Sequence, residues 1–369
     1  MFLYDIPNLL AILIIIIISF RMGFIPLWLF FFLGLFAFTP FILNDVLFPA
    51  SYMPDQFSYF TKVQKIRSLD LDFATNLKLW VSTWMLALIP LPYVETIKSL
   101  GFFNRLISTV LIIWLYSSKN LRGWPLLFVL LYPSFILYSS LALRDTLVAS
   151  LMIISVILFI ENRRLFALLI VSPLLIIKTQ NFLLIVVFFV VHLYFARGSI
   201  FYKYRYALLT LLLVGLGPYI LTMIELLNYY RRALFVEDGG LLSSYIPLET
   251  IGDFMISALQ SAPYFLMKPM PWEADSLLQL IQSLENFYIV IFLVFIFLKA
   301  WKIDKNIAIK WLIYIFISFT IYGLAVFNFG TAVRYKFPFI LLVVIGIAYE
   351  LYLKHGKFIL NKGDKGRKL

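Results

Sequence analysis

The sequence predicts an all-α integral membrane protein that crosses the bilayer about 11–13 times and has one larger external loop. Of its 369 residues, 63% are hydrophobic and 14% are charged, whereas soluble domains are about half apolar and about a quarter charged. Apolar runs follow one another along the chain, and no hydrophilic stretch is long enough for a soluble domain. We therefore expect residues 1–369 to form a single transmembrane domain.

The composition also argues against several functional classes. The chain has no cysteine and two histidines, which leaves no basis for disulfides, thiolate chemistry or a histidine-rich metal site. It contains no Walker loop, GxGxxG or HExxH pattern, so no metal or other cofactor is expected. The net charge of +12 lies mostly in short loops and the C-terminal tail. That distribution is typical of the positive-inside bias, not of nucleic-acid binding.

The predicted membrane helices are the apolar runs themselves. A span needs about 20 apolar residues, and fewer where a water-filled cavity shortens the apolar distance that the helix must cross. Pro133 and Pro173 each interrupt a run, which predicts kinks beside polar cavities. The runs are 8–20, 24–43, 76–93, 104–118, 125–142, 146–160, 165–177, 182–196, 207–225, 284–299, 308–327 and 337–353.

Lysine and arginine set the predicted orientation. The tail 354–369 carries five lysines and one arginine, so it is expected in the cytoplasm. Counting spans backwards from this tail puts Arg144, Lys178, Arg334 and the main loop 226–283 outside. The charge rule agrees with that alternation from residue 119 onward. Upstream, the same count puts the loop 44–75 inside, but the mixed charges of this loop do not decide its side.

Leu143-Arg144-Asp145 is the most informative interruption, because it divides an apolar stretch that runs from Pro125 to Ile160. A charge at the centre of a bilayer costs at least about 2.5 kcal/mol and marks a function by default. At an interface the pair is less costly, and one interpretation is a local ion pair that only closes a turn. The functional interpretation is that Arg144 binds an anionic headgroup, while Asp145 orients it or takes a proton.

Two later interruptions repeat this pattern on the same predicted face. Lys178, Gln180 and Asn181 separate two runs, and Arg334, Tyr335 and Lys336 precede the last run. Snorkelling at the interface is one explanation of these residues, but lysine at an external turn runs against the usual charge bias, which favours a functional role equally. The nearby Pro338 fits near the start of the last helix.

The loop 226–283 supplies further candidate binding residues. Two prolines hold an aromatic ring next to a carboxylate, and such pairs bind sugars by stacking and hydroxyl contacts, although an interfacial anchor is the simpler alternative. His192, within an apolar run, is expected to be a satisfied core residue. The candidates are Arg231, Arg232, Lys268, Trp272 and Glu273, with Glu285 and Asn286 at the head of the next span.

These motifs resemble the bacterial polysaccharide repeat-unit polymerases of the O-antigen polymerase type. The likeness covers about residues 130–340 and lies in short motifs. Such enzymes are similar to the wider class of lipid-phosphosugar glycosyltransferases with the GT-C membrane fold. Many of that class place an acidic residue in the first external loop, which Asp55 matches if 44–75 is external; on this ground we expect it outside. The motifs are Pro133-Ser134, Ser139-Ser140, Leu143-Arg144-Asp145, Lys178-Thr179-Gln180-Asn181, Lys268-Pro269, Pro271-Trp272-Glu273, Glu285-Asn286, Gly330-Thr331, Arg334-Tyr335-Lys336 and Pro338.

The resemblance implies an enzyme of the bacterial inner membrane that polymerises polyprenyl-diphosphate-linked repeat units of a surface polysaccharide. Membrane lipids, a chain-length regulator and a flippase of the same pathway are the implied partners. Diphosphate leaves in such a reaction, so fixed cations are the expected catalysts. The expected cations are Arg144, Lys178, Arg334 and Lys336, then Arg231 and Arg232. The expected base is a carboxylate, because the external loop lacks the histidine of the related ligases; Asp145 and Glu273 are candidates, and Asp55 if its loop is external.

Three alternatives stay open at this point. A GT-C transferase or ligase would use the same cations with a different acceptor. A lipid-linked oligosaccharide flippase or other transporter would need polar residues through the depth of the membrane, and here they gather at one predicted face. A non-enzymatic membrane scaffold would leave the external Arg and Lys residues replaceable.

Overall fold

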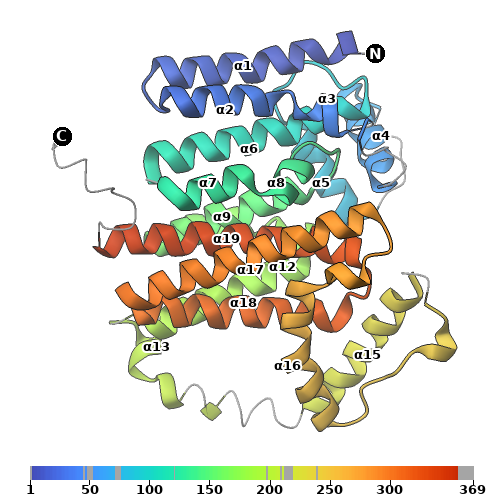
Figure 1. The fold of residues 1–369 in the computed structure, drawn as a ribbon, viewed down its shortest axis with the longest axis vertical. Coiled ribbons are helices and arrows are strands. Elements are labelled where there is room, and N and C mark those ends of the chain that lie inside the picture. The colour runs from blue at the N-terminus through green and yellow to red at the C-terminus, as the bar shows by residue number, and fades with distance from the viewer. Residues whose placement is uncertain are drawn as a thin grey trace. The chain divides into compact units, whose positions relative to one another are not determined.

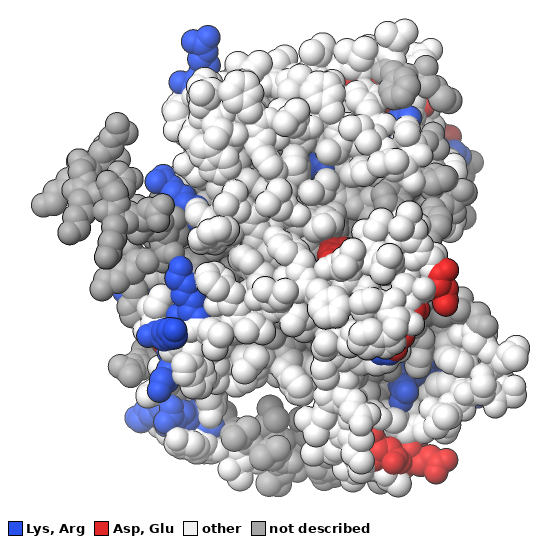
Figure 2. All heavy atoms as spheres, viewed as in Figure 1, with Lys and Arg blue, Asp and Glu red and all other residues white. Residues whose placement is uncertain are grey.

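The computed structural model describes residues 2–44, 46–47, 53–70, 76–119, 121–196, 198–207, 210–211, 219–237 and 240–355. Every element of these ranges is a helix (Figure 1). Five helices are long and apolar enough to cross a membrane: Leu3–Arg21, Ile97–Ser118, Leu277–Ile303, Lys305–Ala325 and Phe329–Lys354. The all-α prediction is therefore confirmed, and the lengths and compositions of these helices indicate a membrane protein. Most of the surface in Figure 2 carries neither Lys or Arg nor Asp or Glu.

The chain divides into two compact units, which we describe separately. Unit 1 contains residues 1–185 and 348–369, and unit 2 contains residues 186–347. Unit 1 contains η1 (Phe2–Asp5), α1 (Ile6–Arg21), α2 (Leu27–Ala37), α3 (Thr39–Leu43), α4 (Asp55–Arg67), α5 (Leu77–Ala87), α6 (Ile97–Lys119), α7 (Gly123–Leu131), α8 (Pro133–Tyr138), α9 (Asp145–Ile160), α10 (Arg164–Val171), α11 (Leu174–Ile177) and the start of α12 (Thr179–Phe195).

Prolines divide two of the predicted runs, as expected. Pro133 opens α8 directly after α7, and Pro173 lies between α10 and α11. Each proline lacks the amide that a continuous helix would use, so the helix ends and restarts there. Both runs are therefore pairs of shorter helices.

The N-terminus of unit 1 is fastened to the start of α6. The buried carboxylate of Asp5 accepts hydrogen bonds from Thr96 Oγ1 at 2.7 Å and from Ser99 Oγ at 2.5 Å. The side chain of Asn8 exchanges hydrogen bonds with the backbone of Tyr93 at 2.9 and 3.1 Å. These contacts place the beginning of α1 and the beginning of α6 at the same end of unit 1.

The predicted span 76–93 is shorter in the structure. Helix α5 has 11 residues, so at about 1.5 Å per residue it is about 16 Å long, against about 30 Å of hydrocarbon core. The Arg67 guanidinium ends it by donating to the carbonyls of Ala87, Ile89 and Leu91. Helix α5 packs against α4 and is too short to cross alone. Without this span, the backward count places the segment 44–75 on the same side as Arg144.

Unit 2 is also helical, including much of the stretch 226–283. It holds the end of α12, α13 (Ile200–Lys203), α15 (Ile220–Glu237), η4 (Leu242–Ser244), α16 (Ile251–Met267), η5 (Pro271–Glu273), α17 (Leu277–Ile303), α18 (Lys305–Ala325) and most of α19 (Phe329–His355). Helix α16 packs along α18 (Figure 1). Gly323 allows this, because a Cβ there would meet the Ser261 carbonyl oxygen. The external placement of 226–283 stays a prediction.

The last helix begins earlier than the sequence predicted. Helix α19 starts at Phe329, so Gly330 to Lys336 lie on it and Pro338 is inside it, not near its start. The turn expected at Gly330 to Lys336 is thus wrong. The non-helical connection between α18 and α19 is instead Val326–Asn328. An apolar environment offers no partners for open backbone, which favours continuing the helix through these polar residues. The tail beyond His355 and parts of the predicted span 207–225 lie outside the described residues.

Candidate functional site

Residues 139–144, which we call the Arg144 turn, connect α8 to α9 in unit 1. Side chains from two other helices bind its backbone. Asn104 of α6 donates to the carbonyls of Leu141 at 2.6 Å and Leu143 at 2.5 Å. Gln56 of α4 accepts a hydrogen bond from the Ala142 amide at 2.9 Å. The turn is therefore a fixed element, because buried backbone groups that are paired in this way are costly to expose.

A second set of polar contacts holds the beginning of the turn. The guanidinium of Arg105, which is 1% exposed, donates to the Ile136 carbonyl at 2.9 Å and to Ser140 Oγ at 2.5 Å. Ser140 Oγ also shares a hydrogen bond with Thr39 Oγ1 at 2.9 Å. The ring of Phe36 lies 5.2 Å from the Arg105 guanidinium. The buried Arg105 therefore fixes the end of α8, where the chain enters the Arg144 turn.

Asp145 begins α9 and forms a buried ion pair with Lys178. The ammonium nitrogen lies 3.7 Å from Asp145 Oδ1, and the two side chains are 9% and 1% exposed. Lys178 ends α11, so the pair joins two of the three interruptions that the sequence singled out. Charges removed from water persist when they are paired, and a carboxylate in the first turn of a helix is favoured by the helix dipole.

Arg144 differs from its neighbours because the one electrostatic contact of its guanidinium in the described part of the chain is with an aromatic ring. Its side chain is half-buried, and its guanidinium lies 5.9 Å from the centre of the Tyr59 ring. Within the described ranges, it has no hydrogen-bond or ion-pair partner. The fold therefore presents a planar cation with its donors available, a group suited to two-pronged binding of phosphate or carboxylate oxygens.

Helix α4 brings a carboxylate to this region. Asp55 is its first residue and is exposed, and it precedes Gln56, which contacts the Arg144 turn. Residues four apart share a helix face, so Asp55 lies one turn before Tyr59, the residue that faces Arg144. Helix α4 thus places a polar first turn beside an arginine. The first turn of α4 and the Arg144 turn consequently lie at the same end of unit 1.

Several of these residues were missed by sequence reasoning. Gln56, Tyr59, Asn104 and Arg105 were not among the candidates, although Asn104 and Arg105 stand at the edge of an apolar run. A polar pair next to such a run is the signal that could have found them, since buried polar groups need partners.

The remaining candidates of the second interruption have different environments. Asn181 is fully buried, and its amide donates to the Met152 sulfur at 3.1 Å. Gln180 is exposed. Residues 179–181 form the first turn of α12. Of the turn predicted between the two spans, only Lys178 lies outside a helix.

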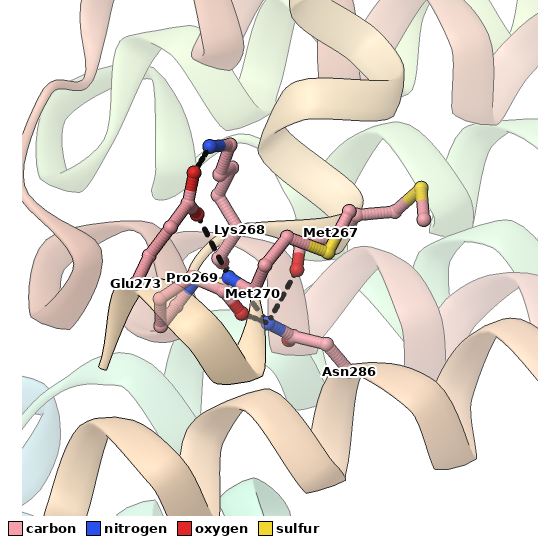
Figure 3. Close-up of polar contacts among 6 residues, drawn as sticks. All are labelled: Met267, Lys268, Pro269, Met270, Glu273 and Asn286. Atoms are coloured by element: carbon pink, nitrogen blue, oxygen red, sulfur yellow. Dashed lines mark hydrogen bonds and ion pairs between the residues drawn. The ribbon is translucent and has the colours of Figure 1, made fainter.

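A second polar cluster lies in unit 2, around the end of α16. Lys336, which is fully buried, donates to Asn286 Oδ1 and, at 3.3 Å, to the Leu266 carbonyl. The amide of Asn286 donates to the carbonyls of Met267 at 3.1 Å and Lys268 at 3.0 Å (Figure 3). Glu285 acts electrostatically on Lys336. These contacts satisfy the last carbonyls of α16, which have no partner within the helix.

The segment after α16 is closed by its own residues. Lys268 and Glu273 form an ion pair, and Glu273 Oε2 accepts from the Met270 amide at 2.9 Å (Figure 3). Trp272 stands out from this turn and is 77% exposed. The turn therefore presents an aromatic face on a short, internally bonded loop.

The other cationic candidates of unit 2 are arranged separately. Arg334 and Tyr335 are half-buried on α19, and the Tyr335 ring packs 5.2 Å from that of Tyr322. Arg231 lies on α15 with its guanidinium 5.8 Å from the Phe327 ring, and its buried Nε and Nη1 donate to no described group. Burial lowers the pKa of Arg231 from its usual value. Arg232 beside it is exposed.

His192 has a partner, as expected for a core residue. Its Nδ1 lies 3.1 Å from the buried ammonium of Lys310. This contact gives the buried polar side chain of Lys310 a partner within unit 2. Comparison of the sequence with known protein families and with curated proteins, and of the structure with solved structures, finds no match.

Proposed function

We propose that this protein is a membrane glycosyltransferase that polymerises polyprenyl-diphosphate-linked oligosaccharide repeat units on the external face of a bacterial inner membrane. One observation carries the proposal: next to the buried Asp145–Lys178 pair, the half-buried guanidinium of Arg144 makes no hydrogen bond or ion pair with any residue that the structure describes. It stands at the head of an apolar helix. A lipid-anchored anion meets a protein where apolar helices end, and a fixed guanidinium is the natural group to receive it.

The proposed reaction forms one bond and breaks another at the anomeric carbon of the donor. A hydroxyl oxygen of the acceptor saccharide attacks that carbon, and the bond between the carbon and the phosphate oxygen breaks. The electron pair leaves with the lipid diphosphate, and the hydroxyl proton passes to a carboxylate. Arg144 stabilises the charge that develops on the departing diphosphate, because its position is set before the reaction begins.

Asp55 is the carboxylate that we propose as the base. Asp145 forms an ion pair with Lys178, and Glu273 binds both Lys268 and the Met270 amide, so both serve the fold. Asp55 is exposed in the first turn of α4 and lies on the helix that contacts the Arg144 turn. Reach to the substrate hydroxyl is the first requirement of a general base, and an exposed carboxylate meets it most directly.

Unit 2, considered by itself, carries further candidate binding residues. Trp272 gives a saccharide an exposed ring to stack on, since the apolar face of a sugar packs against aromatic rings. Arg334, Arg231 and Arg232 are further candidates for contacts with anionic groups of the substrate. Lys336 and Asn286 are assigned to fixing the end of α16, because their polar atoms bind the fold itself.

The function is tested by deleting the gene in a strain that makes the polysaccharide and analysing the lipid-linked saccharides that remain. The proposal predicts that long polymer is lost and that single lipid-linked repeat units accumulate on the external face. Normal polymer that fails to reach its final acceptor would identify a ligase instead. Single units that accumulate on the cytoplasmic face would identify a flippase.

A further inference from the structure

Side chains from elsewhere in unit 1 bind the centre of the Arg144 turn, at the carbonyls of Leu141 and Leu143 and the amide of Ala142, in addition to local backbone bonds at Ser139, Ser140 and Leu143. Gln56, Asn104 and Arg105, which we call the clamp, are each at most 1% exposed. They bind consecutive parts of the segment, from Ile136 through Ala142 to Leu143. A turn at the end of an apolar helix could have been closed by its own residues or by water. Here three buried polar side chains from α4 and α6 bind it in addition to its own local backbone bonds.

The clamp also connects the two groups assigned to chemistry. Gln56 follows Asp55 directly in the sequence. Its side-chain oxygen accepts a hydrogen bond from the amide of Ala142, two residues before Arg144. Asn104 fixes the carbonyl of Leu143, the residue next to Arg144. A shift of the turn relative to α4 therefore breaks a bond to Gln56, and a shift relative to α6 breaks bonds to Asn104.

We propose that Gln56, Asn104 and Arg105 are positioning residues that hold Arg144 and Asp55 in a fixed relation for the reaction. This inference rests on the proposed function for its kinetic consequence, while its structural part stands without it. Catalytic groups that are misplaced by about 1 Å cost about a hundred-fold in rate. Positioning residues therefore affect turnover strongly although they do not touch the substrate.

The sharpest variants are those that keep shape and remove one hydrogen-bonding function. Gln56→Leu removes the acceptor for the Ala142 amide, and Gln56→Glu keeps an acceptor oxygen at that place. Asn104→Asp keeps the size of the side chain but removes the donor for the two turn carbonyls. Gln64→Leu is the matched control, because it makes the first substitution on the same helix at a half-buried position outside the clamp.

The kinetic readout uses purified protein in lipid vesicles with lipid-linked repeat units extracted from the deletion strain. We expect Gln56→Leu and Asn104→Asp to lower kcat about a hundred-fold with little change in KM for the donor. Gln56→Glu should recover most of the rate, and Gln64→Leu should match the unchanged protein. A clamp that served folding alone would reduce the yield of folded protein and leave kcat of the remainder intact.

A second readout does not depend on activity. The chain has no cysteine, so Leu143→Cys places a single thiol in the turn at a fully buried position. We expect this thiol to resist a thiol reagent in the unchanged background and with Gln64→Leu, and to react in the Asn104→Asp and Gln56→Leu backgrounds. Ile112→Cys, also buried in α6, should stay protected in all of them and so exclude global unfolding.

The outcomes separate this inference from the proposed function. Protection of the Leu143→Cys thiol in all backgrounds, or an unchanged kcat in both clamp variants, would overturn the inference. If the protein had a different activity, the transfer assay would be silent in every variant, including the control. The labelling result would then still decide whether the clamp holds the turn.

Discussion

Lys178 Nζ lies 3.7 Å from Asp145 Oδ1, and both side chains are withdrawn from solvent. The two residues come from separate interruptions of the apolar sequence, and the structure joins them at the ends of α11 and α9. An ion pair of this kind uses two charges to stabilise each other and leaves the adjacent Arg144 available. The division between structural and available charge is the basis of the function proposed above.

Removing one member of the pair should destabilise the protein more than removing both. Asp145→Asn or Lys178→Met removes one charge of a buried ion pair, which costs about 3–5 kcal/mol. The double variant replaces the pair by neutral groups and should regain much of that loss. Thermal unfolding in detergent measures all three. Additive losses in the double variant would show that the two charges do not interact.

Gly101 should be irreplaceable for a reason that concerns the Arg144 turn. A Cβ at this position of α6 would meet the Ser140 carbonyl oxygen, whereas a Cβ at Gly34 of α2 would meet nothing. We expect Gly101→Ala to displace the turn and to abolish most transfer activity. Gly34→Ala should be neutral or slightly stabilising, because alanine favours a helix by about 1 kcal/mol over glycine. Equal activity of the two alanine variants would contradict the close approach at Ser140.

The sequence predicted the all-α class correctly because long apolar runs are typical of helices that cross a membrane or pack in a core, and five such helices are present in the described residues. The run 76–93 overestimated the length of α5, because the helix ends at Ala87, where Arg67 binds the last helical carbonyl, shortly before Pro90 and Pro92. The sequence could not predict that α19 extends back to Phe329, since the buried partners of Lys336 come from residues distant in the chain. Local pattern carries no information on such partners.

The same limit applies to the candidate site. Arg144, Asp145 and Lys178 were visible because each interrupts an apolar run. Gln56, Asn104 and Arg105 were not, because their role depends on backbone groups that lie 31 to 86 residues away in the chain. Only the tertiary fold shows which polar side chains serve the structure and which remain available to a ligand.

The short α5 leads to a prediction about membrane topology. If α5 does not cross the membrane, Ser58 on α4 lies on the same side as Arg144 and Gln180. Single cysteines at Ser58 and Gln180 should be labelled by an impermeant thiol reagent in intact cells. A cysteine at Arg164, at the opposite end of α9, should be labelled only after lysis. Protection of the Ser58 cysteine in intact cells would place α4 inside and remove Asp55 from the proposed site.

The central claim is that Arg144 serves the departing diphosphate and not the fold. Loss of one such preorganised donor costs about a hundred-fold or more in rate. Lysine keeps the charge of arginine but loses its planar fork, so Arg144→Lys should fall between the unchanged protein and Arg144→Ala. Arg163→Ala is the matched control, because Arg163 is exposed and lies beyond the opposite end of α9.

The most direct measurement is the length distribution of lipid-linked saccharides in cells that produce each variant at equal membrane abundance. The account predicts full-length polymer with Arg163→Ala, shortened polymer with Arg144→Lys, and single lipid-linked repeat units with Arg144→Ala. Full-length polymer from Arg144→Ala at normal abundance would contradict it.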